Sequence, residues 1–309
     1  MPKRVIVIVN KWWECDPLMS VLVNDNARPW PDLKWPQPLN HPRQRPDQQK
    51  LPPENQSPVP RAVFNLANIK VEVWCLSDLL EHLPDKPQFQ SSSERKIAQL
   101  PKIFVGQTPD LVIAVGTAGL PGQVSENGSV VVGTRIFMHN AHPNGENPDS
   151  NWQVGPFDQI LPSKLDRTVF SPLTDIETSS TKPSVMDRFL VTPLNPAGRG
   201  ILLAGYDYVA LGSVNVTNYK EYAQTDKATL DAYLINGDPA TGRSLETTHG
   251  LIRVQSDAPF IFVSGITDRV GHFDDEVGPR PYAQNTVAAH NAGIVVAWMI
   301  PRINTFFSN

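Results

Sequence analysis

The chain has 309 residues, of which 40% are hydrophobic, and its formal net charge is −4 with a pI near 6.0. So small an acidic excess gives no electrostatic reason to expect binding to nucleic acid or to an anionic membrane. Two cysteines, Cys15 and Cys75, are too few for a disulfide framework or a four-thiolate zinc site. The sequence shows neither an apolar run of membrane-spanning length nor a signal-peptide pattern, so we expect a soluble, cytoplasmic protein.

Expected strands and helices alternate along the chain. Apolar, β-branched runs predict strands at 4–9, 69–75, 110–116, 129–138, 208–216 and 260–263, with shorter candidates at 188–192 and 200–204. Helical spacing predicts helices at 78–82, 92–105 with a break at Pro101, 218–234, 245–254 and 282–306 with an end or kink at Pro301; residues 18–23 fit either a helix or a strand. This alternation predicts an α/β fold with a central twisted, mostly parallel (mixed) sheet flanked by helices. We expect residues 1–309 to form a single domain.

Proline is unusually frequent, with 30 residues, and it clusters in two regions. Because proline removes a backbone donor and fixes φ, we expect a Pro-rich insert at about 25–65 and a loop-rich insert at about 140–190. The first insert has two interpretations. It is an exposed extended loop, or it is a lid or subunit-contact arm anchored by Trp30 and Trp35.

Two of the predicted central strands end in residues suited to ligand binding. Phe260 to Val263 reads as a buried strand, and Asp268 follows it at the carboxyl end, where open α/β sheets bind their ligands. The alternative is that Asp268 only caps the next segment. Residues 109–122 form a second apolar strand that leads into a glycine-rich turn, but the glycine spacing is neither the dinucleotide fingerprint nor a P-loop.

Four stretches, taken in order, resemble a known family. Val115-Gly-Thr-Ala-Gly119 is similar to the turn T-G-S-A-G, and Gly128 to His139 resembles G-D-I-V-V-S…Y-H. Ser244-Leu-Glu-Thr-Thr248 is similar to E-M-E-x-[ST], and Pro259 to Asp268 resembles P-F-V-x-x-R-x-I-S-D. The chain thus resembles the nucleoside phosphorylase/nucleosidase superfamily, and within it most closely the methylthioadenosine/S-adenosylhomocysteine nucleosidases.

The resemblance covers roughly residues 4–15 and 105–300, and it implies cleavage of the N-glycosidic bond of a purine nucleoside or a 5′-modified nucleoside. It places Asp268 at the imidazole ring of the base, Glu246 on the ribose hydroxyls and Glu14 at the attacking water. That chemistry needs a proton for the leaving base and a negative charge beside the developing cation. Three alternatives stay open: Glu246 as an exposed first-turn helix acid, His249 in place of Glu246, and Glu14 as an exposed loop acid.

The same resemblance implies a set of contacts to the substrate. Its members are Thr117, Ala118, Gly119, Asn215, Val216, Leu245 and Phe157. Trp152 and Phe157 lie in a stretch resembling a family loop that crosses to a neighbouring subunit, so we expect a homodimer or larger homo-oligomer. We expect no cofactor and no metal, with water or inorganic phosphate as co-substrate. The pair His139 and His142 would need a third ligand to hold a metal.

Two absences favour hydrolysis over phosphorolysis. The phosphorylases of the superfamily carry an Arg where this chain has Ala114, and a Gly-x-x-x-Arg loop that residues 10–16 do not supply. A third departure, Ser264 at the position of the Arg that precedes the catalytic Asp, keeps another class open: a nucleoside- or nucleotide-binding protein without turnover. The sequence therefore favours a nucleosidase, with a phosphorylase and a binding protein as alternatives.

Overall fold

The computed structural model describes residues 3–24, 60–66, 68–81, 92–121, 125–140, 160–161, 163–165, 185–196, 200–203, 206–211, 226–227, 230, 242–277 and 282–303. Most of both predicted inserts and most of the helix predicted at 218–234 lie outside these ranges. None of the helices within them has the length and apolar character needed to cross a membrane.

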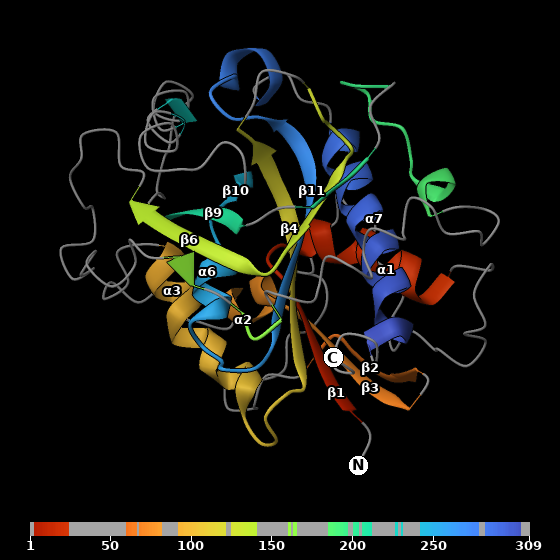
Figure 1. Ribbon diagram of the computed structural model, residues 1–309, viewed down its shortest axis with the longest axis vertical. Helices are drawn as coiled ribbons and strands as arrows, with labels where there is room; N and C mark the ends of the chain where they lie inside the picture. The colour runs from red at the N-terminus through yellow and green to blue at the C-terminus, as the bar shows by residue number, and fades with distance from the viewer. Residues whose placement is uncertain are drawn as a thin grey trace.

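The centre of the fold is a parallel sheet whose strands run in the order β3, β1, β4 and β11 (Figure 1). Their bounds are β1 Lys3–Val9, β3 Ile69–Cys75, β4 Leu111–Leu120 and β11 Phe260–Arg269. All four are buried along nearly their whole length, which is typical of parallel strands covered on both faces; β1, β4 and β11 are largely apolar, whereas β3 alternates through Lys70 and Glu72. The strands predicted at 4–9, 69–75, 110–116 and 260–263 are confirmed.

Shorter strands extend this centre and make the sheet mixed. Their bounds are β2 Ala62–Leu66, β5 Val130–Gly133, β6 Arg135–Asn140, β7 Ile160–Leu161, β8 Ile201–Leu203, β9 Tyr206–Leu211 and β10 Gly242–Glu246. β2 pairs antiparallel with β3, β5 with β11, β10 with β4 and β7 with β6, whereas β8 with β5, β9 with β10 and β6 with β9 are parallel. The predicted fold class, a mostly parallel mixed sheet flanked by helices, is confirmed.

Helices cover both faces of the sheet (Figure 1). On one face α1, Trp12–Asn24, packs against α7, Tyr282–Met299. On the other face lie α2, Leu76–Glu81, α3, Ser92–Gln99, and α6, His249–Arg253. Alternate residues of each central strand belong to two separate hydrophobic clusters, one under α1 and α7 and the other under α2, α3 and α6.

Close packing fixes where α7 sits on the sheet. A Cβ added at Gly265 of β11 would overlap the backbone carbonyl of Ala288, and one at Gly293 would come 3.0 Å from the Cα of Leu18 on α1. Glycine at both positions therefore allows the backbones of β11, α7 and α1 to approach one another directly. This contact holds the carboxyl end of β11 in a fixed position.

Several predicted boundaries differ from the structure. Residues 188–192 are not a strand; the 3-10 helix Met186–Arg188 precedes an irregular segment whose Leu190 N–H donates to the Asn291 side chain. The predicted helix at 245–254 divides into the end of β10 and α6, and the strand predicted at 129–138 breaks at Thr134 into β5 and β6. The predicted break at Pro101 begins a 3-10 turn, Leu100–Phe104, and that at Pro301 lies in another, Ile300–Arg302.

Candidate active site

The candidate site lies where β4 changes its neighbour. β1 pairs with β4 only as far as Val115, whereas β4 continues to Leu120. Further along, Gly119 pairs antiparallel with Leu245 of β10. Among the described residues, no strand pairs with this edge of β4 between these two pairings, and in α/β sheets such points at the carboxyl ends of strands are where ligands bind. The predicted residues Thr117 and Ala118 lie in this stretch, and Gly119 ends it.

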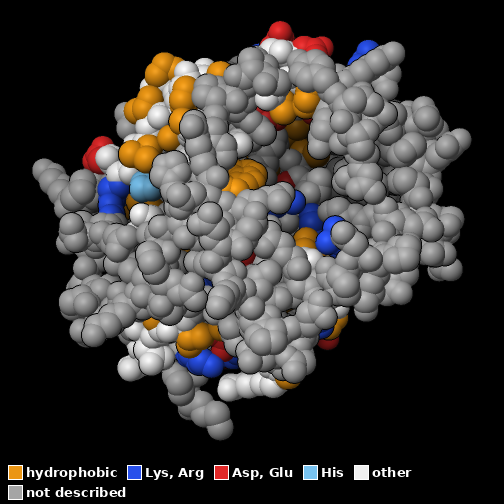
Figure 2. All heavy atoms as spheres, turned by 180° about the vertical axis from the view of Figure 1, so that it is seen from behind, with side chains coloured by type: hydrophobic (Ala, Val, Ile, Leu, Met, Phe, Trp, Pro, Cys, Tyr) orange, Lys and Arg blue, Asp and Glu red, His pale blue; other side chains and the backbone are white. Residues whose placement is uncertain are grey.

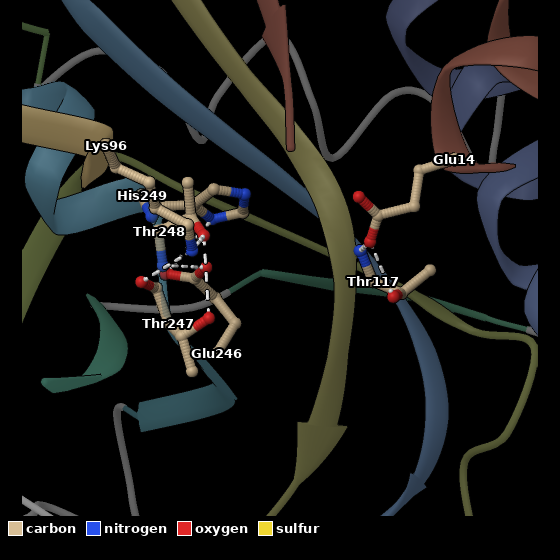
Figure 3. Close-up of polar contacts among 7 residues, drawn as sticks. All are labelled: Glu14, Lys96, Thr117, Glu246, Thr247, Thr248 and His249. Atoms are coloured by element: carbon tan, nitrogen blue, oxygen red, sulfur yellow. Dashed lines mark hydrogen bonds and ion pairs between the residues drawn. The ribbon is translucent and has the colours of Figure 1, made fainter. Parts of the chain in front are cut away.

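Glu14 fills part of the open edge. It lies in the first turn of α1 and is 3% exposed, so the alternative of an exposed loop acid is wrong. Its Oε1 accepts hydrogen bonds from the Thr117 N–H at 2.8 Å and the Thr117 hydroxyl at 2.7 Å (Figure 3). Its Oε2 accepts one from the Lys11 N–H at 2.8 Å. The Glu14 carboxylate thus accepts a hydrogen bond from a backbone N–H that would otherwise donate to a neighbouring strand. This hydrogen bond explains why Glu14 is buried.

Glu246 reaches the site from the end of β10. It is 8% exposed, and its carboxylate accepts hydrogen bonds from the N–H groups of Thr248 and His249, the latter at 2.7 Å. These donors open α6, so Glu246 holds the start of that helix. The prediction that Glu246 lies within a helix is wrong, and so is the alternative of an exposed first-turn acid. The residue belongs to a strand because its neighbour Leu245 pairs with Gly119 and Tyr208.

His249, considered from the sequence as an alternative to Glu246, also lies at the site. It is 1% exposed, its Nδ1 is 3.8 Å from Glu246 Oε1, and its ring stacks on Phe262 with centroids 6.1 Å apart. A Cβ added at Gly116 would lie 3.3 Å from His249 Nε2 and 3.6 Å from Glu14 Oε1. Glycine at position 116 therefore leaves room for these two side chains beside the same residue of β4.

Lys96 is a site residue that the sequence analysis missed. It comes from α3, is 2% exposed, and its Nζ donates to Thr248 Oγ1 at 2.6 Å and to the Thr247 carbonyl at 3.5 Å. Burial lowers the pKa of the Lys96 ammonium to about 8; the charge of Lys11 acts in the same direction, whereas the carboxylates of Glu246 and Glu14 oppose the shift. A signal was present, because Lys96 shares helical spacing with the apolar Leu100 and Ile103.

Asp268 stands on the opposite edge of β4. It lies within β11 rather than after it, at an irregularity of the β11–β4 register, and it faces Gly119, which in turn faces Leu245. Three predicted site residues therefore form one row across β10, β4 and β11. Asp268 is 7% exposed and accepts a hydrogen bond from the Thr267 hydroxyl. A Cβ at Gly119 would come 3.4 Å from Asp268 Oδ2 and 2.5 Å from Val270 Cγ2, so a side chain there would crowd the carboxylate.

The polar groups form two clusters separated by β4 (Figure 3). Glu14 and Thr117 form the first, and Lys96, Glu246, Thr247, Thr248 and His249 form the second. The first cluster presents a carboxylate fixed by three donors. The second combines a carboxylate with a buried ammonium. This arrangement is suited to polarising a bound molecule, because fixed charges removed from solvent act more strongly than charges in water.

Some predicted residues cannot be placed at this site. Asn215, Val216 and Phe157 lie outside the described residues, as do Trp152 and His142. Subunit contacts through Phe157 therefore stay a prediction. No group of three or more potential metal ligands occurs among the residues that the structure describes.

One further observation bears on the alternatives. Ser264, at the position of the family Arg, is fully buried in β11 opposite Gly116, and no described residue hydrogen-bonds its Oγ. On the face seen from behind, hydrophobic, acidic and basic side chains of described residues are all visible (Figure 2).

The sequence matches no protein-family model and no curated protein. Solved structures do match. The 5′-methylthioadenosine/S-adenosylhomocysteine nucleosidase of Colwellia psychrerythraea, in complex with adenine, has a TM-score of 0.54 at 13% identity over 97% of this chain and 95% of that one. The 5′-methylthioadenosine nucleosidase of Arabidopsis thaliana has a TM-score of 0.54 at 11% identity over 99% and 97%.

The nucleosidase of Neisseria meningitidis, in complex with methylthio-immucillin-A, has a TM-score of 0.51 at 14% identity and covers 97% of this chain and 99% of that one. Identities this low are evidence of a shared fold. The resemblance found in four short stretches is thus confirmed for the architecture as a whole: the chain has the fold of the 5′-methylthioadenosine/S-adenosylhomocysteine nucleosidases.

Proposed function

We propose that the protein hydrolyses the N-glycosidic bond of a purine nucleoside or of a 5′-modified nucleoside. The observation that carries the proposal is the convergence of three carboxylates from distant parts of the chain on one stretch of β4. Glu14 binds Thr117, Asp268 faces Gly119, and Glu246 follows the residue that pairs with Gly119. All three acids are buried, and buried carboxylates lower folding stability unless hydrogen bonds or opposite charges compensate them.

We assign a role to each carboxylate. Asp268 protonates or hydrogen-bonds the leaving base, since a purine anion is a poor leaving group. Glu246 holds the ribose and places its negative charge beside the anomeric carbon as that carbon becomes cationic. Glu14 activates the water. An ionised carboxylate has about four acceptor positions, and donors from the described residues fill three of those of Glu14, which leaves one for a water molecule.

The contacts of Thr117 favour hydrolysis over phosphorolysis. Its N–H and hydroxyl, at the glycine-rich part of β4, are donors that a phosphate oxygen would use, and Glu14 already occupies both. A phosphate bound there would also meet the carboxylate charge of Glu14 at close range. Ala114, where the phosphorylases carry an Arg, is fully buried and supplies no cation. We therefore propose water as the co-substrate and no cofactor.

The similar structures are consistent with a ligand of this kind, because one holds adenine and another holds methylthio-immucillin-A. The substrate is tested by incubating the protein with a panel of purine nucleosides and 5′-modified nucleosides, with and without inorganic phosphate, and measuring free base. We expect base release that does not depend on phosphate. Strict dependence on phosphate would establish the phosphorylase instead. Ligand-induced thermal stabilisation with no base released on long incubation would establish a binding protein.

A further inference from the structure

Lys96 is buried among the proposed catalytic groups, yet the chemistry proposed above gives it no task. Resting on that proposed function, we infer that Lys96 is a positioning residue, whose ammonium fixes the Glu246 carboxylate through Thr248 and keeps it ionised. The inference goes beyond the three carboxylates because it assigns a role to a lysine on a different helix, α3.

The geometry is a chain of hydrogen bonds that joins three elements. An ammonium has only donors, so Thr248 Oγ1 accepts from Lys96 Nζ at 2.6 Å. The N–H of Thr248 in turn donates to Glu246, together with the N–H of His249. α3, the start of α6 and the end of β10 are thereby tied at one point (Figure 3). A shift of Thr248 would move both donors that orient the Glu246 carboxylate.

The charges point the same way. The groups that face Lys96 are Glu246 from β10, Glu14 from α1, Lys11 just before α1, and His249 from α6, which begins beside the Lys96–Thr248 contact. Both carboxylates favour the charged form of Lys96. Because this attraction is mutual, the Lys96 ammonium in turn favours an ionised Glu246. An ionised Glu246 is the form that stabilises a developing cation. Because the pKa of Lys96 is about 8, this support is lost as the pH rises above that value.

The decisive variant is Lys96→Met, which keeps most of the side-chain volume and removes the charge. On the nucleoside found by the panel, we expect kcat to fall about ten- to a hundred-fold, with KM changing much less. We also expect the acid limb of the pH–rate profile to move to higher pH and the basic limb near pH 8 to disappear. Lys102→Met, an exposed lysine in the 3-10 turn that follows α3, is the matched control and should leave both limbs in place.

Thr248→Val separates the two parts of the role, because it removes the acceptor but keeps the charge. It should lower kcat and leave the acid limb where it is in the wild type. A folded Lys96→Met protein with wild-type kcat and an unchanged pH profile would overturn the inference, since a purely structural lysine would behave in that way.

A second readout does not depend on turnover. Lysine side chains labelled for NMR can be titrated in the wild type and in Glu246→Gln, with Lys96→Met used to assign the signal. We expect the titration midpoint of Lys96 to fall when the Glu246 charge is removed, because that charge favours the ammonium. An unchanged midpoint would refute the inference even in an active enzyme. If no nucleoside releases base, the proposed function fails, while this titration still decides whether Lys96 and Glu246 are coupled.

Discussion

The buried ammonium of Lys96 predicts a specific pH dependence of folding stability. The pKa of this group is about 8 in the folded protein, against an ordinary value of 10.5. Between these two values the unfolded chain binds the proton more tightly than the folded protein, so the free energy of unfolding rises with pH across that window. The cost of burying the charge is fully present below pH 8 and is gone above 10.5. At 1.36 kcal/mol per pH unit, the gain from this one group is about 3 kcal/mol.

The assay is urea unfolding of the wild type and of Lys96→Met at pH 7 and at about pH 10. Other groups titrate in both proteins, so the difference between the two isolates Lys96. We expect the wild type to gain about 2–3 kcal/mol relative to the variant between these conditions. Lys102→Met should follow the wild type, because that side chain is exposed. Parallel pH dependence in the wild type and in Lys96→Met would show that Lys96 is not buried as a cation, and the reasoning would fail.

Three further substitutions test the site and its support. Asp268→Asn removes the proposed proton donor and should lower the rate about a hundred- to ten-thousand-fold with little change in melting temperature; a near-normal rate would exclude that role. Gly116→Ala places a methyl group 3.3 Å from His249 Nε2, so the rate of base release should fall while the far-UV circular dichroism spectrum stays unchanged. Full activity of this variant would contradict an active site beside Gly116. Gly265→Ala overlaps the Ala288 carbonyl and should lower the free energy of unfolding by several kcal/mol, which urea titration measures.

The sequence predicted the central strands because their signal is local. Residues 5–9 and 260–263 are unbroken apolar runs rich in β-branched and aromatic residues, and both the composition and the shortness of such runs favour buried strands. The glycine-rich stretch around Gly116 and the acid at Asp268 were also visible, since each directly continues a strong strand. The parallel pairing of β4 with β11 brings the glycine-rich stretch and Asp268 together, because the carboxyl ends of both strands then lie at the same edge of the sheet.

Features decided by distant contacts were not predictable in the same way. Glu246 was predicted in a helix, but the pairing of Leu245 with Gly119 makes that segment a strand, and the two partners are far apart in sequence. Lys96 contacts Thr248 across 152 residues. For Glu14 an exposed loop was one alternative, whereas the residue lies in α1, which begins at Trp12 and passes through Pro17. Pro17 is the sixth residue of α1, beyond the first four N–H groups, so it removes one internal hydrogen bond of the helix without ending it.

The burial of Glu14 and the position of the site have one physical origin. A parallel strand that extends beyond the end of its neighbour leaves a backbone N–H without a strand partner. A buried N–H of this kind needs another hydrogen-bond acceptor. At Thr117 the partner is a carboxylate from the helix that follows the shorter strand, β1. The connection from β1 into α1 crosses the carboxyl end of the sheet, so an acid in the first turn of α1 is placed beside the open edge of β4. A group that completes the sheet in this way is held rigidly by backbone geometry, and rigid placement of charge is what hydrolysis of a glycosidic bond requires.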